Sequence, residues 1–268
     1  MTVTTFLRQL NLRQRLGLGL FGMVLAFALF GGLVSDADPA KQNLSLAFES
    51  PSLAHPFGTD HFGRSMLARL VAATRLSLGL ALICVLSAAI AGTLLGFLAA
   101  WRGGWIDRVL SGLADALVAI PGLLIVLLVA AFAPGAYWPL YLGLSLVLWI
   151  EYFRIVRAQA SVLISSPQVE AASLLGFGPL YVFRNHIVPE IGPIIGTLMA
   201  FGSATAILSL AALGFVGVGL RPPTAEWGIM MTELLPYYDE APWLIASPIL
   251  LLVMTVLGLS LLAGKDAR

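Results

Sequence analysis

Six long apolar runs constrain the fold of this chain more than any other feature. Hydrophobic residues make up 59% of its 268 residues and charged residues only 11%, whereas soluble domains carry about a quarter charged residues. Each run is close to the ~20 residues that a helix needs to cross a bilayer. The sequence therefore predicts an all-α integral membrane protein with six transmembrane helices. We place them at Leu16–Val34, Leu76–Ala100, Val109–Phe132, Leu140–Ala160, Ile191–Leu220 and Trp243–Ala263.

The first apolar run has two interpretations. Because Arg8, Arg13 and Arg15 precede it, the run resembles a secretion signal. Its apolar stretch is nevertheless longer than the usual ~7–15-residue signal core. We interpret it as a retained span, and cleavage near Ala37 remains the alternative.

The basic residues indicate how the spans are oriented. If the N-terminus is inside, ten of the 15 Lys and Arg residues fall in inner segments and five in outer segments. An excess of Lys and Arg marks the cytoplasmic side. We therefore expect both termini and residues 161–190 in the cytoplasm, and residues 36–75 outside. The net charge of only +1 gives no indication of a nucleic-acid partner.

A polar stretch, "QVEAASLLGFGPLYVFRNHIVPE" at 168–190, interrupts the apolar runs. Its first half has the signals of a short helix. Ser166 can cap the helix, Pro167 fits the first helical position, and Glu170 lies in the first turn, where the helix dipole favours an anion. A short helix is therefore predicted to begin at Pro167.

The second half of the same stretch has the signals of a turn and a second helix. Gly176 and Gly178 can end the first helix, and Pro179 can open a second one over residues 180–187. Pro189 is expected to break the chain before the fifth span. The pattern predicts a short helix–turn–helix lying across the membrane surface. A simple amphipathic connector is the alternative interpretation.

These residues resemble a known family motif. Glu170-Ala171-Ala172, then Gly176, then Ile187-Val188-Pro189 is similar to the "EAA" loop of ABC importer permeases, with Val188 in place of the more usual leucine. The resemblance implies that the short helix is a coupling helix that docks in a cleft of an ATPase subunit. The residues it assigns to ATPase coupling are Glu170, Ala171, Ala172, Gly176 and Pro189.

Two further motifs narrow the resemblance. "HPFGTDHFGRSMLARLVAATRLSLG" at 55–79 and "LGFVGVGLRPPTAEWGIMM" at 213–231 are similar to signatures of the dipeptide/oligopeptide/nickel permeases. Ser65 and Ala68 depart from the usual Asp and Ser. The resemblance covers residues 55–264 and implies a type I ABC importer transmembrane domain over 76–268, with coupling segment 161–190. Residues 1–75 are then an N-terminal cytoplasmic segment, the first span and a periplasmic segment.

The resemblance also implies partners. They are a homologous permease in a heterodimer, two ABC ATPase subunits that bind ATP and Mg, and a periplasmic or lipid-anchored solute-binding protein. The complex would lie in the cytoplasmic (inner) membrane of a bacterium or archaeon. Its cargo would be peptides, nickel or metal chelates. No cofactor is expected in this chain.

The residues themselves indicate no catalytic chemistry. A G-x-x-x-x-G-K-[ST] phosphate loop is missing, and "LAGKDAR" at the end of the chain has the wrong spacing. The sequence also shows no Ser/His/Asp or Cys/His arrangement. A membrane-embedded enzyme and a secondary transporter are the alternatives. We disfavour both, because convergent polar groups and an internal repeat are missing.

Four residues are candidates for the translocation path. Asp115 is an intramembrane carboxylate without an obvious partner in the sequence, and such groups are usually functional. Ser203, Thr205 and Ser209 can line a polar path, or their hydroxyls can bond to carbonyls of their own helix. Glu151 is set aside, because Arg154 follows it by three residues and is expected to form a local ion pair with it.

A stripe of small residues, two histidines and a cysteine are the remaining features of the sequence. Gly192, Gly196, Ala200 and Ala204 form a small-residue stripe that lets helices approach closely, for instance at a dimer seam. His55 and His61 flank Asp60, but two histidines without a further ligand are weak grounds for a metal site. We predict no metal site. Cys84 is the one cysteine, so an internal disulfide is impossible.

Overall fold

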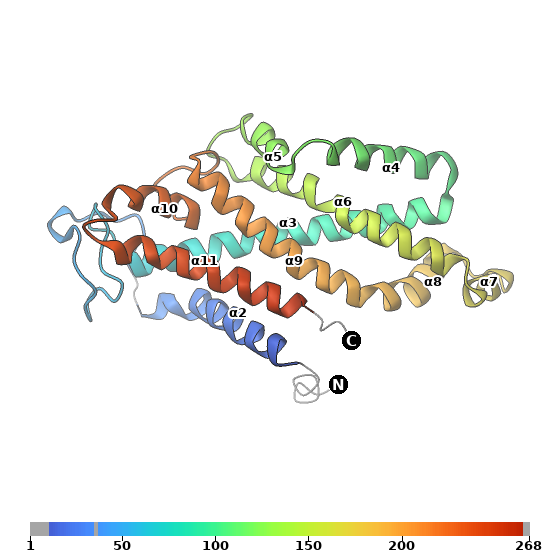
Figure 1. The fold of residues 1–268 in the computed structure, drawn as a ribbon, viewed down its shortest axis with the longest axis horizontal. Helices are drawn as coiled ribbons and strands as arrows, with labels where there is room; N and C mark the ends of the chain where they lie inside the picture. Colours follow the sequence, from blue (N-terminus) through green and yellow to red (C-terminus); the bar gives the residue numbers. More distant parts are fainter. Residues whose placement is uncertain (1–10, 35–36, 265–268) are drawn as a thin grey trace.

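Long helices lie side by side along the long axis of the molecule in the computed structural model, which describes residues 11–34 and 37–264 (Figure 1). Apart from one isolated β-bridge between Thr59 and Ser65, the described part is helical or irregular. The long helices are α2 (Leu12–Phe30), α3 (Met66–Arg102), α4 (Gly104–Val118), α6 (Tyr137–Ile164), α9 (Val188–Phe215) and α11 (Pro242–Ala263). The short helices are α5 (Gly122–Ala130), α7 (Pro167–Leu174), α8 (Pro179–Val182) and α10 (Trp227–Leu234).

The helices confirm the predicted all-α membrane fold. Five spans among the described residues are long and apolar enough to cross a membrane, and α4 with α5 makes a sixth if this bent pair counts as one span. The predicted third span, 109–132, is therefore not a single helix. Its two parts meet at an angle of 86°, because Pro121 lacks an amide proton and disfavours helical backbone at the preceding residue.

The prediction that Pro189 breaks the chain is wrong. Residues from Pro179 to Phe215 form one helical span, in which a π-helical segment, Phe183–Ile187, joins α8 to α9. Pro189 lies in the first turn of α9. A π turn changes the hydrogen-bond register locally, so that a residue without an amide proton is accommodated.

Helices α3 and α6 form the centre of the bundle, and glycines bring them together. A Cβ atom on Gly92 would lie 2.5 Å from the carbonyl oxygen of Trp149, and one on Gly96 would lie 2.7 Å from that of Phe153. Only glycine permits such a close approach. Because of these contacts, the segment of α6 from Trp149 to Phe153 lies level with Gly92–Gly96 of α3.

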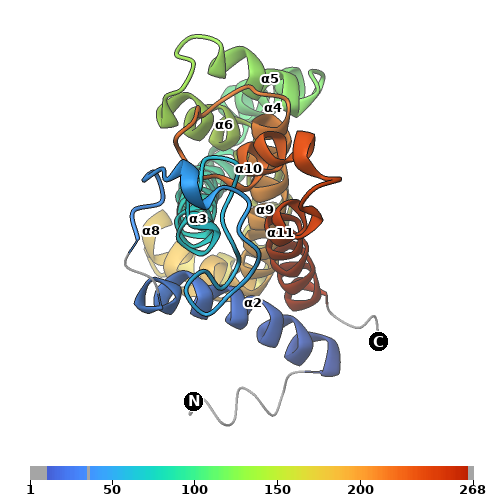
Figure 2. The same ribbon diagram turned by 90° about the vertical axis from the view of Figure 1, so that its left-hand side faces the viewer.

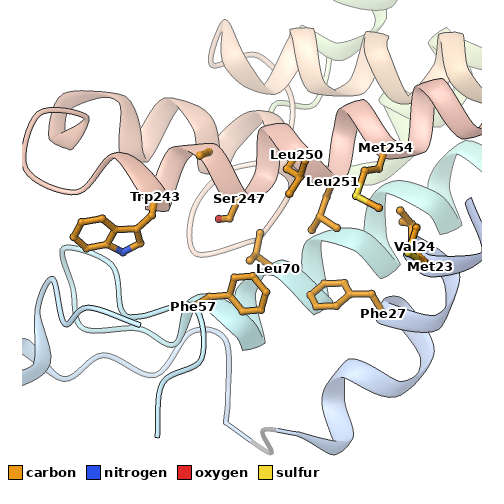
Figure 3. Close-up of a pocket in the computed structure, with 11 residues that line it drawn as sticks. Met23, Val24, Phe27, Phe57, Leu70, Trp243, Ser247, Leu250, Leu251 and Met254 are labelled. Atoms are coloured by element: carbon orange, nitrogen blue, oxygen red, sulfur yellow. The ribbon is translucent and has the colours of Figure 1, made fainter. Parts of the chain in front are cut away.

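Helix α2 covers one side of the bundle, opposite α4 and α5 (Figures 1 and 2). It packs on α11, where a Cβ atom on Gly17 would lie 2.7 Å from the carbonyl oxygen of Gly258. Between α2, α3 and α11 lies a cavity of about 450 Å³ with apolar walls that include Phe27, Leu70 and Trp243 (Figure 3). None of the described residues that line this cavity is titratable.

The two ends of the bundle differ. Residues 37–65 and α10 lie at one end, which Figure 2 views from outside, and α7 with α8 lies at the other (Figure 1). We call them the α10 end and the α7 end. The predicted N-terminal segment lies partly in residues 1–10, which include Arg8 and are outside the described residues. Two further basic residues, Lys265 and Arg268, are also outside the described residues.

Candidate functional site

Helix α7 begins where the sequence predicts, but its cap differs. Pro167 occupies the first turn, and Glu170 lies there too with its side chain exposed. The predicted capping bond from Ser166 is wrong. Its backbone is extended, as at a cap, but its hydroxyl makes no hydrogen bond and is buried. The Ser166 carbonyl instead accepts hydrogen bonds from the amides of Val169 (3.1 Å) and Glu170 (3.0 Å).

The end of α7 is a glycine-dependent turn. The amide of Phe177 donates to the carbonyl of Ala172 (3.1 Å), and the amide of Gly176 donates to that of Ser173 (3.0 Å). These two bonds define a Schellman motif, which places its glycine in the left-handed region. Gly176 has φ +85°, as this motif requires, so the prediction that Gly176 can end the helix is confirmed.

A small apolar cluster fixes α7 to the body of the protein. Val169 and Ala172 are buried on the inner side of the helix. They belong to the segment that packs on α6 and the start of α9 through a core of its own, formed by Val156, Ala160, Val169, Val182, Ile187 and Ile191. Of the residues in the predicted coupling set, Glu170, Ala171, Gly176 and Pro189 are exposed and Ala172 is not. Ala172 therefore supports the helix from within.

Large apolar side chains surround the turn after α7. The exposed fractions of Leu174, Leu175 and Leu180 are 83%, 76% and 77%. The rings of Phe177 and Tyr181 stack beside them at 4.1 Å between centroids. We call these five residues the α7 patch. A cluster of exposed apolar residues of this kind marks an interaction surface.

The α10 end contains a buried cluster of charges that sequence reasoning missed. The carboxylate of Asp60 accepts hydrogen bonds from Nε of Arg64 at 2.6 Å and from Arg69, and Arg69 also bonds Glu233 of α10. Asp60 and Arg69 are fully buried, and Arg64 is nearly so. Burial alone raises the pKa of Asp60, but the Arg64 amide and the guanidinium groups of Arg69 and Arg64 lower it below its usual value.

A second acidic residue fixes α10 to α9. The carboxylate of Glu226 accepts a hydrogen bond from the amide of Ile229 at 3.1 Å and so caps α10. A Cβ atom on Gly214 would lie 2.4 Å from Glu226 Oε2, and one on Gly228 would lie 2.1 Å from the Ala211 carbonyl oxygen. Burial raises the pKa of Glu226. The Ser77 hydroxyl donates a long hydrogen bond of 3.5 Å to Glu226 Oε1, so the two motifs at 55–79 and 213–231 are in contact.

Ion pairs join α4 to α6, and they contradict the predicted pairing. Arg154 Nη2 lies 2.6 Å from Asp115 Oδ1, and Arg157 Nη2 lies 2.6 Å from Asp107 Oδ2. The expected pair between Glu151 and Arg154 is absent from the hydrogen bonds and ion pairs of the described residues. The chain reverses after α3, so that α4 brings Asp115 within reach of Arg154.

The other predicted path residues do not converge. Ser203 donates its hydroxyl hydrogen bond to the Met199 carbonyl at 2.8 Å, which agrees with the alternative interpretation of this residue. Thr205 is exposed and Ser209 half-buried on the same helix, α9. The small-residue stripe is open at its first half, because a Cβ atom on Gly192 or Gly196 would meet no described atom within 4 Å.

The two histidines lie in separate contacts. His55 Nε2 lies 3.5 Å from Glu49, whereas the ring of His61 stacks on Tyr237 with centroids 4.7 Å apart. Across residues 11–34 and 37–264, no group of three His, Cys, Asp or Glu side chains converges in a metal-binding arrangement.

Comparisons with known proteins agree with the resemblance seen in the motifs. The family model described as "Binding-protein-dependent transport system inner membrane component" matches residues 92–264. The dipeptide transport system permease protein DppC of Alkalihalophilus pseudofirmus is 32% identical over 254 residues, which cover 94% of this chain and 83% of the relative. A Brucella suis protein provisionally named as a peptide transport system permease is 32% identical over 249 residues, covering 92% of this chain and 83% of that protein.

Proposed function

Because the chain belongs to the family of inner membrane components of binding-protein-dependent transport systems, we propose that it is a permease subunit of an ATP-driven peptide importer. As a member of this family it is a multi-pass, non-catalytic subunit of the inner membrane and has no cofactor of its own. We further propose its energy source, its cargo and the residues that couple it to ATP hydrolysis.

The α7 patch carries the proposal. The single chain leaves Leu174, Leu175 and Leu180 exposed around a helix turn, and a cluster of exposed apolar side chains is a typical interaction surface. An ATPase subunit that covers this patch would bury it. Glu170 lies exposed in the first turn of the same helix, where it can meet basic groups of that subunit. Closure of the ATPases on binding ATP and Mg would then move α7, and with it α6 and α9.

The remaining partners follow from the family. We propose a homologous permease as the second half of the path, two ATPase subunits, and a periplasmic or lipid-anchored solute-binding protein. Peptides are the proposed cargo rather than nickel or metal chelates, because the relatives that cover most of this chain are named for dipeptide or peptide transport. The type I importer architecture suits a subunit with one coupling segment between its fourth and fifth crossings.

The proposed orientation places the α7 end in the cytoplasm. Six crossings, with α4 and α5 as one bent span, return both termini to the α7 side, in agreement with the basic-residue asymmetry. Ser45 and Ser173 are exposed at opposite ends, so Ser45→Cys and Ser173→Cys should react with an impermeant thiol reagent from opposite sides. Labelling of both from one side would refute the orientation. We also propose that α2 is retained, since Gly17 packs it on α11.

The experiment that tests the function is uptake measured together with ATP hydrolysis. In vesicles containing the complete complex, Gly176→Val and Glu170→Lys should abolish binding-protein-stimulated hydrolysis and uptake while the permease still inserts. Valine is strained at a φ of +85°, and lysine reverses the charge in the first turn. Glu240→Lys, an exposed charge reversal at the α10 end, is the control. Wild-type coupling in both α7 variants would reduce the segment to a connector.

A further inference from the structure

A cavity between α4, α5 and α6 combines apolar walls with two charged groups. Its volume is about 380 Å³, within the range of roughly 300–1,000 Å³ that is typical of small-molecule sites. Leu117, Ile125 and Val147 contribute to the apolar wall, and Glu151 and Arg154 supply the charges. A mostly apolar pocket with a few convergent polar groups is the usual form of a ligand site.

The two charged groups retain capacity to bind. Arg154 uses Nη2 to bond Asp115 at 2.6 Å, and a guanidinium group has five N–H donors, so others remain. The carboxylate of Glu151 is exposed and has no hydrogen bond or ion pair within the described part of the chain. A carboxylate and a guanidinium group therefore line one cavity with unused donors and acceptors.

The charged groups of Glu151, Arg154 and Asp115 lie within the membrane-spanning part of the helices, and this position limits what they can face. Glu151 lies near the middle of the 28-residue helix α6, level with Gly92–Gly96 in the apolar part of α3. Asp115 and Arg154 are 67% and 47% exposed in the single chain. Charged side chains are costly in lipid, and those within spans face water-filled cavities or protein partners. This face of α4 and α6 therefore lies on the translocation path or on the second permease.

We propose that Glu151 and Arg154 form a contact site for a zwitterionic solute on the translocation path. The Glu151 carboxylate binds the ammonium group of a peptide N-terminus, a free Arg154 N–H group binds a peptide carboxylate, and the apolar wall takes up a side chain. Because an opposite charge is present for each end of the solute, a peptide crosses this depth without losing all its polar partners. The inference rests on the proposed importer function.

The first test compares two peptides in reconstituted complexes. Glu151→Gln should slow uptake of a peptide with a free N-terminus by about tenfold or more, as expected for loss of a charge-assisted hydrogen bond. Uptake of the same peptide with an acetylated N-terminus should stay within about twofold. The binding protein selects between the two peptides equally for wild type and variant. Its preference therefore cancels when the ratio of variant to wild-type uptake is compared between the peptides. Gln159→Ala, an exposed change on the same helix, is the control. Equal losses for both peptides, or no loss, would overturn the proposal.

The second test does not depend on transport of the acetylated peptide. Ile155 lines the same cavity, and the natural Cys84 is buried, so an anionic thiol reagent should report on Ile155→Cys. The free peptide should protect this cysteine when Glu151 is present and fail to protect it in the double variant with Glu151→Gln. Absence of labelling, or equal protection with Glu151 and with Gln at this position, would contradict the proposed site. Failure of the importer function itself would appear separately, as wild-type uptake that needs neither ATP nor the binding protein.

Discussion

The α10 end and the α7 end of the bundle differ in the kind of side chain that they bury and expose. At the α10 end, Asp60 and Arg69 are fully buried and bonded to other charged groups of the same chain. At the α7 end, Leu174 and Leu175 are apolar and mostly exposed. The chain thus completes one end from its own residues and leaves an apolar surface at the other. We therefore expect stability to be concentrated at the α10 end, and the proposed contact with an ATPase subunit to lie at the α7 end.

Two glycines show the same difference between a tightly packed end and an open end. Gly63 and Gly176 both have positive φ, +68° and +85°. A Cβ atom on Gly63 would lie 1.7 Å from the Asn43 carbonyl oxygen, whereas one on Gly176 would meet nothing within 4 Å. At position 63 both the positive φ and the nearby Asn43 carbonyl require glycine. At position 176 only the positive φ requires it.

The largest expected effect is at the buried charges. Asp60→Asn should lower the free energy of unfolding by about 3–5 kcal/mol, because two buried guanidinium groups lose a shared carboxylate. The measurement is thermal or denaturant unfolding of the purified protein in detergent. A loss below about 1 kcal/mol would show that the α10 end is not the stable end.

The two glycines should rank next. Gly63→Ala should destabilise the protein by about 2–4 kcal/mol, from strain and overpacking together. Gly176→Ala should cost only about 1–2 kcal/mol, from backbone strain. Gly178 has φ −81°, so Gly178→Ala should be tolerated and serves as the matched control. Equal losses at Gly63 and Gly176 in the same unfolding assay would remove the contrast between the ends.

The stability supplied by Asp60 at the α10 end should depend on pH. The folded-state pKa of Asp60 is lowered overall, since the Arg64 amide and the guanidinium groups outweigh burial, which raises it. Its contribution is therefore present above the unfolded value of about 3.9 and is lost as pH falls through the lower folded value. The difference in Tm between wild type and Asp60→Asn should stay constant from about pH 8 to 5 and shrink only below about pH 4. A difference that disappears by about pH 6 would contradict this assignment.

The smallest expected effect on stability is at the α7 patch. Leu174→Ser should change the free energy of unfolding by less than about 0.5 kcal/mol, because the side chain is 83% exposed. The same variant should weaken binding of ATPase subunits, measured by their retention during purification of the complex. A strong loss of stability in the isolated subunit would mean that Leu174 serves the fold rather than a partner.

Local signals were predictable from the sequence. The start of α7 at Pro167 depends on the backbone preference of proline, and the turn after α7 depends on the positive φ of Gly176. The apolar runs likewise predicted the helices that cross the membrane, because length and composition are sufficient for that. These features need no knowledge of distant contacts.

Contacts between distant segments were not predictable in the same way. Arg69 and Glu233 are 164 residues apart in sequence, and no local pattern joins them. Arg154 has an acidic residue close by in sequence, yet it bonds Asp115 from the facing helix α4. The spacing of Glu151 and Arg154 suggested a helical pair, but competition from a facing helix is a tertiary effect that spacing does not contain.

Photo-cross-linking from α7 identifies the subunit that covers the α7 patch. A photo-reactive side chain at Leu174, exposed in the α7 patch, is compared with one at Leu53, which is exposed in the segment 37–65 that lies at the α10 end. In reconstituted complexes that hydrolyse ATP, the probe at 174 should form a covalent product with an ATPase subunit, and the probe at 53 should not. Active complexes in which position 174 gives no ATPase product, or in which position 53 gives one, would contradict the assignment of α7 as the coupling helix.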